Sequence, residues 1–149
     1  MKIYNRKFNR DFQIIDKFEF GLFLTGQEVK SVRTGTIILE DSYIKILGSE
    51  AYLVNAQISV YKYAGPLKYD PKRSRKILLH KDELIKIKTK INSISGLTVV
   101  PILCYNKGNL IKIQAALVKG RRDIEKRKLE KNRDIERQEK REAKEYMKT

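Results

Sequence analysis

Few side chains in this sequence could carry out covalent chemistry. His80 is the only histidine and Cys104 the only cysteine among the 149 residues. A catalytic triad would need His80 beside a nucleophile and an orienting carboxylate, and Cys104 stands in the apolar run Leu97–Tyr105, which is typical of a core thiol. No P-loop, dinucleotide-binding or serine-hydrolase motif is present. We therefore expect no catalytic residues, no metal site and no cofactor.

The charged and aromatic residues favour RNA binding instead. Lys and Arg number 33 against 18 Asp and Glu, so the formal net charge is +15, and an anionic partner is expected. Cations bind phosphates, and flat side chains stack on unpaired bases. Both types occur in the first dozen residues and in the irregular segment Ala64–Lys76. There Tyr69 precedes Arg73, Arg75 and Lys76, which repel one another unless an anion neutralises them.

Residues 1–118 predict a mainly β domain that would position these side chains. β-Branched and aromatic residues are concentrated in segments separated by Gly, Asn and Asp, and Pro101 predicts an edge or a bulge. Short helices are expected over Gln27–Thr34 and over Asp82–Ser95, the second with Asp82 as N-cap and Gly96 as its stop. Many short strands with few helices favour a small closed antiparallel β-barrel. The expected strands are Phe12–Ile15, Phe20–Thr25, Thr36–Leu39, Ser42–Leu47, Ala51–Ala56, Ile58–Tyr63, Leu97–Tyr105 and Leu110–Val118.

Residues 119–149 differ in composition from residues 1–118 and are interpreted as a separate basic C-terminal tail. They carry 13 basic and 8 acidic residues with few apolar ones. Their residues are good helix formers, but the apolar positions make no face wide enough to dock on a core. A helix held mainly by charge pairs is marginal in water. We expect this tail to be disordered when free and helical when bound to a polyanion.

The sequence gives no indication of a membrane protein. No stretch approaches the roughly 18 apolar residues of a membrane span, and the start of the chain lacks the apolar run of a signal peptide. The tail also lacks the Trp, Phe or Leu face of a membrane-surface helix. We expect a cytoplasmic monomer.

Several local strings match one family together. Their order and spacing hold from about Asn5 to Arg127. In this order they resemble the SsrA-binding protein (SmpB) family: Phe18-Glu19-x-Gly21, Gly26-x-Glu28-Val29-Lys30-Ser31-x-Arg33, Asp70-Pro71-x-Arg73-x-Arg75-Lys76-x-Leu78-Leu79-His80, and Val118-Lys119-Gly120.

The resemblance implies a barrel of oligonucleotide-binding (OB) type that binds the tRNA-like domain of transfer-messenger RNA (tmRNA). It also implies delivery of that RNA to stalled ribosomes for trans-translation. The tail would become helical in the empty mRNA channel near the decoding centre, against 16S ribosomal RNA. Alanyl-tRNA synthetase and the elongation factor that carries aminoacyl-tRNA would be partners through tmRNA. Catalysis would be the ribosome's, and this protein would supply positioning.

Carried over residue by residue, the tmRNA contacts would involve Glu19, Lys112 and the neighbourhood of Leu78. A carboxylate such as Glu19 can accept hydrogen bonds from base N–H groups or a ribose 2′-OH, and Lys112 alternates with apolar neighbours and so faces outward. The full set of expected RNA-binding residues is Arg10, Glu19, Lys30, Arg33, Arg73, Arg75, Lys76, Leu78, His80 and Lys112. The residues expected to contact the ribosome are Lys119, Gly120, Arg121, Arg122, Glu125, Lys126, Arg127, Lys131, Arg133, Ile135 and Arg137, with Gly120 as the hinge into the tail.

The sequence departs from the family pattern at several positions. Arg10 and Phe12 stand where the family commonly has His and Tyr, Glu125 where it usually has Asp, and Ile135 where some relatives have Trp. Two other functions stay open at this point. One is a general single-strand RNA-binding module or a ribosomal protein with a basic extension. The other is a small ribonuclease that uses His80 with Asp82 or Glu83, although His80 is more simply interpreted as holding the junction between loop and helix.

Overall fold

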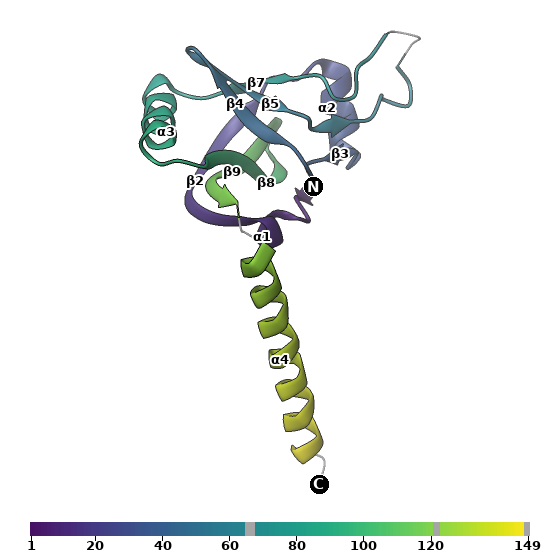
Figure 1. Ribbon diagram of the computed structural model, residues 1–149. Helices are drawn as coiled ribbons and strands as arrows, with labels where there is room; N and C mark the ends of the chain where they lie inside the picture. Colours follow the sequence, from purple (N-terminus) through teal and green to yellow (C-terminus); the bar gives the residue numbers. More distant parts are fainter. Residues whose placement is uncertain (65–67, 121–122, 148–149) are drawn as a thin grey trace.

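The computed structural model describes residues 1–64, 68–120 and 123–147, and within these the side chains of Asn9, residues 123–128 and residues 146–147 are not described. Short helices interrupt a series of strands, and the long helix α4 follows them (Figure 1). The elements are β1 Lys2–Tyr4, α1 Phe8–Asp11, β2 Phe12–Leu22, α2 Gly26–Arg33, β3 Ile37–Ile38, β4 Tyr43–Leu47, β5 Glu50–Val54, β6 Gln57–Ile58, β7 Arg75–Leu78, α3 Lys81–Ser93, β8 Leu97–Lys107, β9 Leu110–Gly120 and α4 Asp123–Met147.

An antiparallel sheet closes on itself to form the body. Its strand order is β1-β8-β4-β5-β7-β2-β9, and a further pairing of β8 with β9 joins six of these strands into a ring to which β1 is added at β8. The long strands β2 and β9 pair from Phe12 opposite Gly120 to Gly21 opposite Lys112. A register shift between Ile14 and Asp16 bends β2, and a second one between Pro101 and Leu103 bends β8. The closed antiparallel sheet and the bulge at Pro101 were both expected.

The hydrophobic core lies inside the ring. Alternate residues of the long strands face inward, among them Phe20 of β2, Val99 of β8 and Ile113 of β9, and all three are at least nine-tenths buried. The helix α3 adds Leu84 and Ile87 to this core. Outside the ring, Phe8 of α1 covers a second, smaller cluster with Val100, Ala116 and Val118. One part of the outer sheet face is therefore closed by α1, and the rest is open to solvent.

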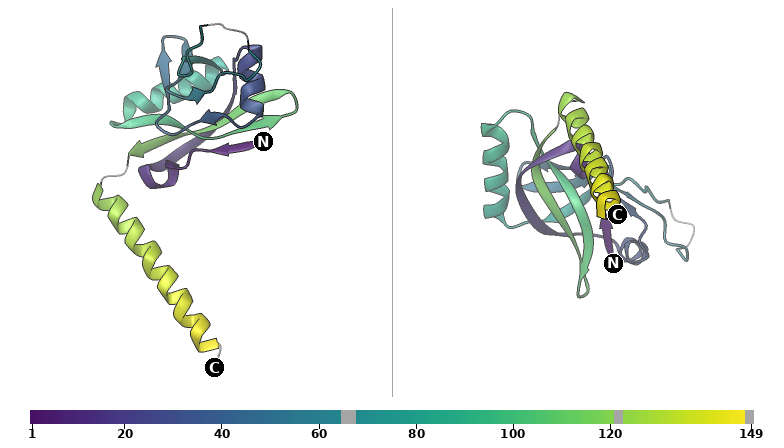
Figure 2. Two further views of the ribbon diagram at one scale, coloured as in Figure 1. Left: turned by 90° about the vertical axis from the view of Figure 1, so that its right-hand side faces the viewer. Right: turned by 90° about the horizontal axis from the view of Figure 1, so that it is seen from below.

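Helix α4 projects away from the body rather than packing on it (Figures 1 and 2). Among its described side chains, from Leu129 to Glu145, all but Leu129 are exposed, and Ile135 keeps 46% of its surface. An ion pair from Arg10 Nε to Glu130 Oε1, 3.3 Å, links α1 to this helix. The described side chains of α4 present no wide apolar face to the body. The expected equilibrium between a disordered and a helical tail stays a prediction.

Two predicted helices are present with shifted ends. The first spans Gly26–Arg33 rather than Gln27–Thr34. The second begins at Lys81 after His80 as N-cap, so Asp82 lies in the first turn and the prediction of Asp82 as N-cap was wrong. A carboxylate there still favours the helix through the positive end of its dipole. The helix ends at Ser93, before Gly96, whose φ of +81° suits glycine.

The strand predictions need four corrections. Phe12–Ile15 and the first part of Phe20–Thr25 belong to one strand, β2, because the residues between them also pair with β9. That strand ends at Leu22, and Thr25 is instead the N-cap of α2. The strand expected over Ile58–Tyr63 ends at Ile58. Part of Ala64–Lys76 is not irregular, since Arg75 and Lys76 pair with β5 as the start of β7. The short elements β1 and α1 were not predicted, because three or four residues carry too little periodicity.

No helix in the described ranges is both long enough and apolar enough to span a membrane.

Cys104 lies on the inner face of β8 and is fully buried, as its apolar surroundings in the sequence indicated. Burial raises the pKa of its thiol to about 12. The thiolate, which is the reactive form, is therefore scarce in the folded protein.

The folded protein should react with Ellman's reagent at mildly alkaline pH far more slowly than free cysteine. In concentrated guanidinium chloride, release of the chromophore should correspond to the one thiol of the chain. Rapid stoichiometric labelling of the native protein would show that Cys104 is not part of a closed core.

Candidate nucleic-acid interface

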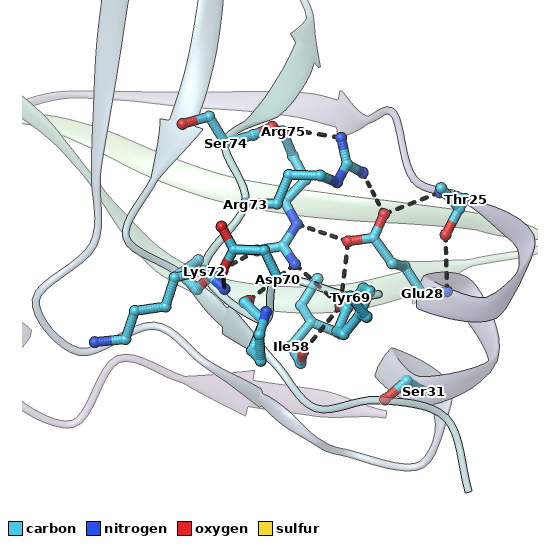
Figure 3. A network of polar contacts seen from close by, with 12 residues as sticks. Thr25, Glu28, Ser31, Ile58, Tyr69, Asp70, Lys72, Arg73, Ser74 and Arg75 are labelled. Carbon is cyan, nitrogen blue, oxygen red and sulfur yellow. Dashed lines mark hydrogen bonds and ion pairs between the residues drawn. The ribbon is translucent and has the colours of Figure 1, made fainter. Parts of the chain in front are cut away.

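A buried carboxylate joins helix α2 to the arginines of the Arg73–Lys76 motif. Glu28 of α2 is 1% exposed and Arg75 of β7 is fully buried. The Arg75 Nε–H donates to Glu28 Oε2 over 2.7 Å, and Arg73 donates to the other carboxylate oxygen, Oε1. Figure 3 shows both guanidinium groups converging on Glu28. Glu28 is thus the anion that allows two arginines to stand two residues apart.

Local structure on each side places these groups. Thr25 and Glu28 form a capping box, in which the Thr25 hydroxyl accepts from the Glu28 N–H and the Glu28 carboxylate accepts from the Thr25 N–H over 3.1 Å. The remaining donors of Arg75 go to the carbonyl oxygens of Ala56 and Pro71, at 2.6 and 3.0 Å, and to the Tyr69 hydroxyl at 3.1 Å. Each nitrogen of the buried guanidinium therefore has a hydrogen-bond acceptor within the protein.

The electrostatics keep Glu28 ionised. Burial alone would raise the pKa of its carboxyl group. Hydrogen bonds from Arg73, from the Thr25 backbone and from Arg75 outweigh that cost, so the pKa lies below its ordinary value. The charge is retained inside the protein because it is fully paired.

This network corrects part of the expected RNA-binding set. Arg75 has no exposed surface, so a direct contact from Arg75 to RNA was a wrong prediction. Tyr69, whose ring was considered for base stacking, is also engaged: its hydroxyl donates to the Ile58 carbonyl oxygen over 2.9 Å and accepts from Arg75. The sequence did show that the clustered cations needed an anion, but it did not show that Glu28, forty-odd residues earlier, supplied it.

A row of paired residues crosses the open outer face of the ring. Gly21 of β2 is opposite Leu78 of β7 on one side and Lys112 of β9 on the other, and Lys112 is opposite Tyr105 of β8. Directly paired residues share one face of a sheet. The residues that follow or precede them, such as Leu22 and Ile113, are buried inside. Leu78, Gly21, Lys112 and Tyr105 therefore form one outward-facing row over four strands, which we call the β7–β8 row.

Glu19 lies beside this row, two residues before Gly21 on the same face. Its Oε1 is 3.6 Å from the Lys112 Nζ. A hydrogen bond from the Tyr105 hydroxyl, and then the charges of Lys107 and Lys112, hold the pKa of Glu19 below its ordinary value despite some desolvation. Desolvation, and then Glu19 itself, raise the pKa of Tyr105 to about 12. At neutral pH this surface presents a carboxylate, an ammonium group and a phenol side by side.

The middle of the row is hollow because Gly21 has no side chain. A Cβ added there would lie 3.3 Å from Leu78 Cδ1, so Leu78 folds over the glycine. A shallow hollow of about 340 Å³ opens beside it. Three exposed apolar side chains line the hollow, Phe23 (63% exposed), Leu78 (53%) and Leu110 (61%). A ligand could reach the strand backbone at this point.

The other expected RNA-binding residues lie around the ring rather than in one cluster. Arg73 keeps 41% of its side-chain surface exposed while it binds Glu28. Lys76 Nζ is 3.2 Å from Glu50 Oε1. On α2, Arg33 donates to the Asn109 carbonyl oxygen over 3.3 Å, and Lys30 faces the ring of Tyr61.

Arg10 and His80 lie at element boundaries. Arg10 is exposed on α1 and pairs with Glu130 of the tail helix. His80 is exposed, and its side chain makes no capping hydrogen bond, although its carbonyl oxygen accepts from the Leu84 N–H over 3.1 Å. The junction between β7 and α3 is therefore held by the backbone of His80 and not by its imidazole.

The expected tail residues are described only in part. Lys119 and Gly120 are the exposed end of β9. Glu125, Lys126 and Arg127 lie in α4, with side chains outside the described set, and Arg121 and Arg122 lie outside the described residues altogether. The exposed residues of α4 include Lys131, Arg133, Ile135 and Arg137.

The described residues contain no group of three or more His, Cys, Asp or Glu side chains that could hold a metal ion.

Comparison with known proteins gives one consistent result. A family model described as SmpB protein matches residues 2–145. The SsrA-binding protein of Sulfurihydrogenibium sp. is 43% identical over 134 residues, which is 90% of this chain and 88% of that protein. The SsrA-binding protein of Persephonella marina is 42% identical with the same coverage of both chains.

A solved structure agrees with these relatives. It is described as "tmRNA-SmpB: a journey to the center of the bacterial ribosome", and one of its chains is 34% identical to this one. The match has a TM-score of 0.67 and covers 85% of this chain and 92% of the other.

Replacement of Glu28 by Gln should destabilise the protein by about 3–5 kcal/mol, because two arginines then lose their shared anion. Urea denaturation followed by circular dichroism measures this change. In the wild-type protein the Glu28 contribution is present above pH 4.5, the ordinary pKa, and is lost as the pH falls through the lower folded-state value. The variant should therefore lose less stability on acidification below that pH.

Glu50→Gln is the matched control, since Glu50 pairs with Lys76 at the exposed surface and its removal should change stability little. Equal stability losses in the two variants would contradict the central role of Glu28.

Proposed function

The chain belongs to the SmpB protein family, and on that basis we propose that it binds the tRNA-like domain of tmRNA and brings this RNA to stalled ribosomes for trans-translation. The relatives at about 40% identity are SsrA-binding proteins. The structural match comes from a tmRNA–SmpB study of the bacterial ribosome. The work of such a protein would take place in the cytoplasm, where ribosomes are.

The β7–β8 row is the observation that carries this proposal. The resemblance assigned tmRNA contacts to Glu19, Lys112 and the region of Leu78, which are far apart in the sequence. The ring brings them onto adjacent strands of one outward face, with Gly21 paired to both Leu78 and Lys112. Lys112 can bind phosphate, and the ionised Glu19 can accept hydrogen bonds from base N–H groups or a ribose 2′-OH.

The ring supports this function as a rigid platform of OB type, in which an RNA is bound across the outer face of a small antiparallel barrel. A face built from paired strands keeps the relative positions of its side chains fixed. Such a face can discriminate a folded RNA by shape, whereas phosphate attraction alone cannot. The protein thus positions RNA, and the chemistry belongs to the ribosome.

The tail helix supports a separate role on the ribosome. Apart from Leu129, its described side chains are exposed, and most of them are charged, so this described part offers no surface that needs to fold back onto the body. A basic helix of this kind is suited to a channel lined by ribosomal RNA, and we assign it to the empty mRNA channel near the decoding centre. Binding to that polyanion would stabilise the helix.

A competition experiment tests the proposed RNA. Labelled tRNA-like domain of tmRNA is bound at physiological salt, where nonspecific attraction is reduced, and challenged with excess ordinary tRNA or unstructured RNA. The complex should persist with wild-type protein, and Lys112→Ala or Glu19→Ala should weaken it by about tenfold. Loss of the complex to either competitor would instead favour a general RNA-binding module.

Lys45→Ala is the matched control, because Lys45 is also an outward-facing strand lysine of the ring but lies on β4. The sign of the Glu19→Ala effect is equally informative. If Glu19 were merely a charge partner of Lys112, its removal would strengthen binding to a polyanion. Stronger binding by that variant would contradict the assigned contact.

Removal of residues 121–149 should separate the two roles. The shortened protein should keep an affinity for the tRNA-like domain close to that of the full chain, since the β7–β8 row is intact. It should fail to support peptide tagging on stalled ribosomes in a reconstituted translation reaction. Tagging by the shortened protein at the full rate would overturn this division of roles.

A further inference from the structure

Two tyrosines and two lysines form a cluster at α2, in which Tyr63, Lys30 and Lys62 are exposed and Tyr61 is partly buried. The ring centroids of Tyr61 and Tyr63 are 5.6 Å apart, with an angle of 69° between the ring planes. The Lys30 ammonium lies 5.6 Å from the Tyr61 centroid, and the Lys62 ammonium lies 5.6 Å from the Tyr63 centroid. We call these four residues the Tyr61–Tyr63 cluster. None of the four belongs to the β7–β8 row.

The backbone holds this cluster in place. The Ala64 N–H donates to the Tyr61 carbonyl oxygen over 2.9 Å, which closes a turn with Lys62 and Tyr63 at its centre. Just before the turn, the Ser59 carbonyl oxygen accepts from the Ser31 hydroxyl of α2 over 2.6 Å. The two rings are therefore presented by a turn that is anchored to a helix.

The exposure of the cluster has no explanation in packing. Tyr63 keeps 75% of its surface exposed, and Val60 keeps 56%. Residues 59–68 contain no acidic residue, so the nearby ammonium groups have no carboxylate on this segment to pair with. Exposed aromatic faces beside cations are the features with which proteins bind single-stranded nucleic acid, the ring stacking on a base and the cation binding phosphate.

The position of the cluster relative to the β7–β8 row is set by α2. Val29 lines the hollow beside that row, and the next residue, Lys30, faces Tyr61. The two surfaces thus flank the same helix. Residues 59–64, which follow β6 and carry the two tyrosines, lie beside α2 and away from α4 (Figure 1).

We propose that the Tyr61–Tyr63 cluster is a second RNA contact, in which an unpaired base stacks on Tyr63 while Lys62 and Lys30 bind the adjoining phosphates. The inference rests on the proposed function, because it takes RNA as the partner. It adds that the RNA reaches around α2 from the β7–β8 row with an unpaired segment. The edge-on contact with Tyr61 fixes the orientation of the Tyr63 ring.

The test uses the full chain and two RNAs, the tRNA-like domain and an unstructured oligouridine. In the first, 2-aminopurine replaces one unpaired base at a time, and stacking is read as a change in its fluorescence on binding. Tyr63→Ala should lose that change at one or more positions and should weaken binding of both RNAs by about tenfold. Tyr63→Phe, which keeps the ring, should behave as the wild type.

Tyr43→Ala is the matched control, an exposed strand tyrosine outside the cluster. Wild-type affinity and fluorescence for Tyr63→Ala would overturn the proposal, as would an equal loss with Tyr43→Ala. The oligouridine separates this result from the proposed function, since stacking on Tyr63 does not require a tRNA-like shape. A protein that fails to prefer the tRNA-like domain, but loses oligouridine binding on Tyr63→Ala, refutes the proposed function and supports this inference.

Discussion

The ionised Glu28 inside the protein is the constraint on which much of the structure depends. A buried carboxylate is tolerated only when donors surround it, and those donors come from three segments: the start of α2, the irregular segment before β7, and β7 itself. Arg75 extends the same network to the carbonyl oxygens that follow β5 and precede β7. Glu28 thereby fixes the positions of α2, β7 and the segment just before β7 relative to one another.

This arrangement decides which charges reach the surface. Arg75 is fully buried against Glu28, and Arg73 is partly buried by its contact with the same carboxylate. The Arg73–Lys76 motif therefore contributes less positive charge to the outer face than its composition suggests. The outer face instead combines an ammonium group, a carboxylate and apolar side chains from β2, β7 and β9. Such a mixed surface is suited to recognition of a particular RNA shape, and the large positive charge of the chain adds attraction over distance.

Sequence reasoning was most successful where a pattern is local. The alternation in β8 and β9, the helices α2 and α3 and the buried position of Cys104 follow from period and composition. Sequence reasoning was wrong where a side chain binds a residue that is distant in the sequence. Arg75 looks like an RNA contact until Glu28 is placed beside it, and Tyr69 looks like a stacking residue until its hydroxyl is paired. Tyr61 and Tyr63 were interpreted as part of a strand, and only the turn after β6 shows that the Tyr63 ring is exposed. Lys112 was placed correctly because strand alternation alone determines the side on which it lies.

The closure of the ring by β2 and β9 also sets the order in which the protein can fold during its own synthesis. Phe12 pairs with Gly120, and the other neighbour of β2, strand β7, begins only at Arg75. When β2 leaves the ribosome it has neither neighbour, so one of its edges stays open until β7 has been translated and the other until β9 has been translated. Contacts this distant in sequence form slowly, and open strand edges pair readily with other chains. A product truncated before β9 would therefore be prone to aggregation.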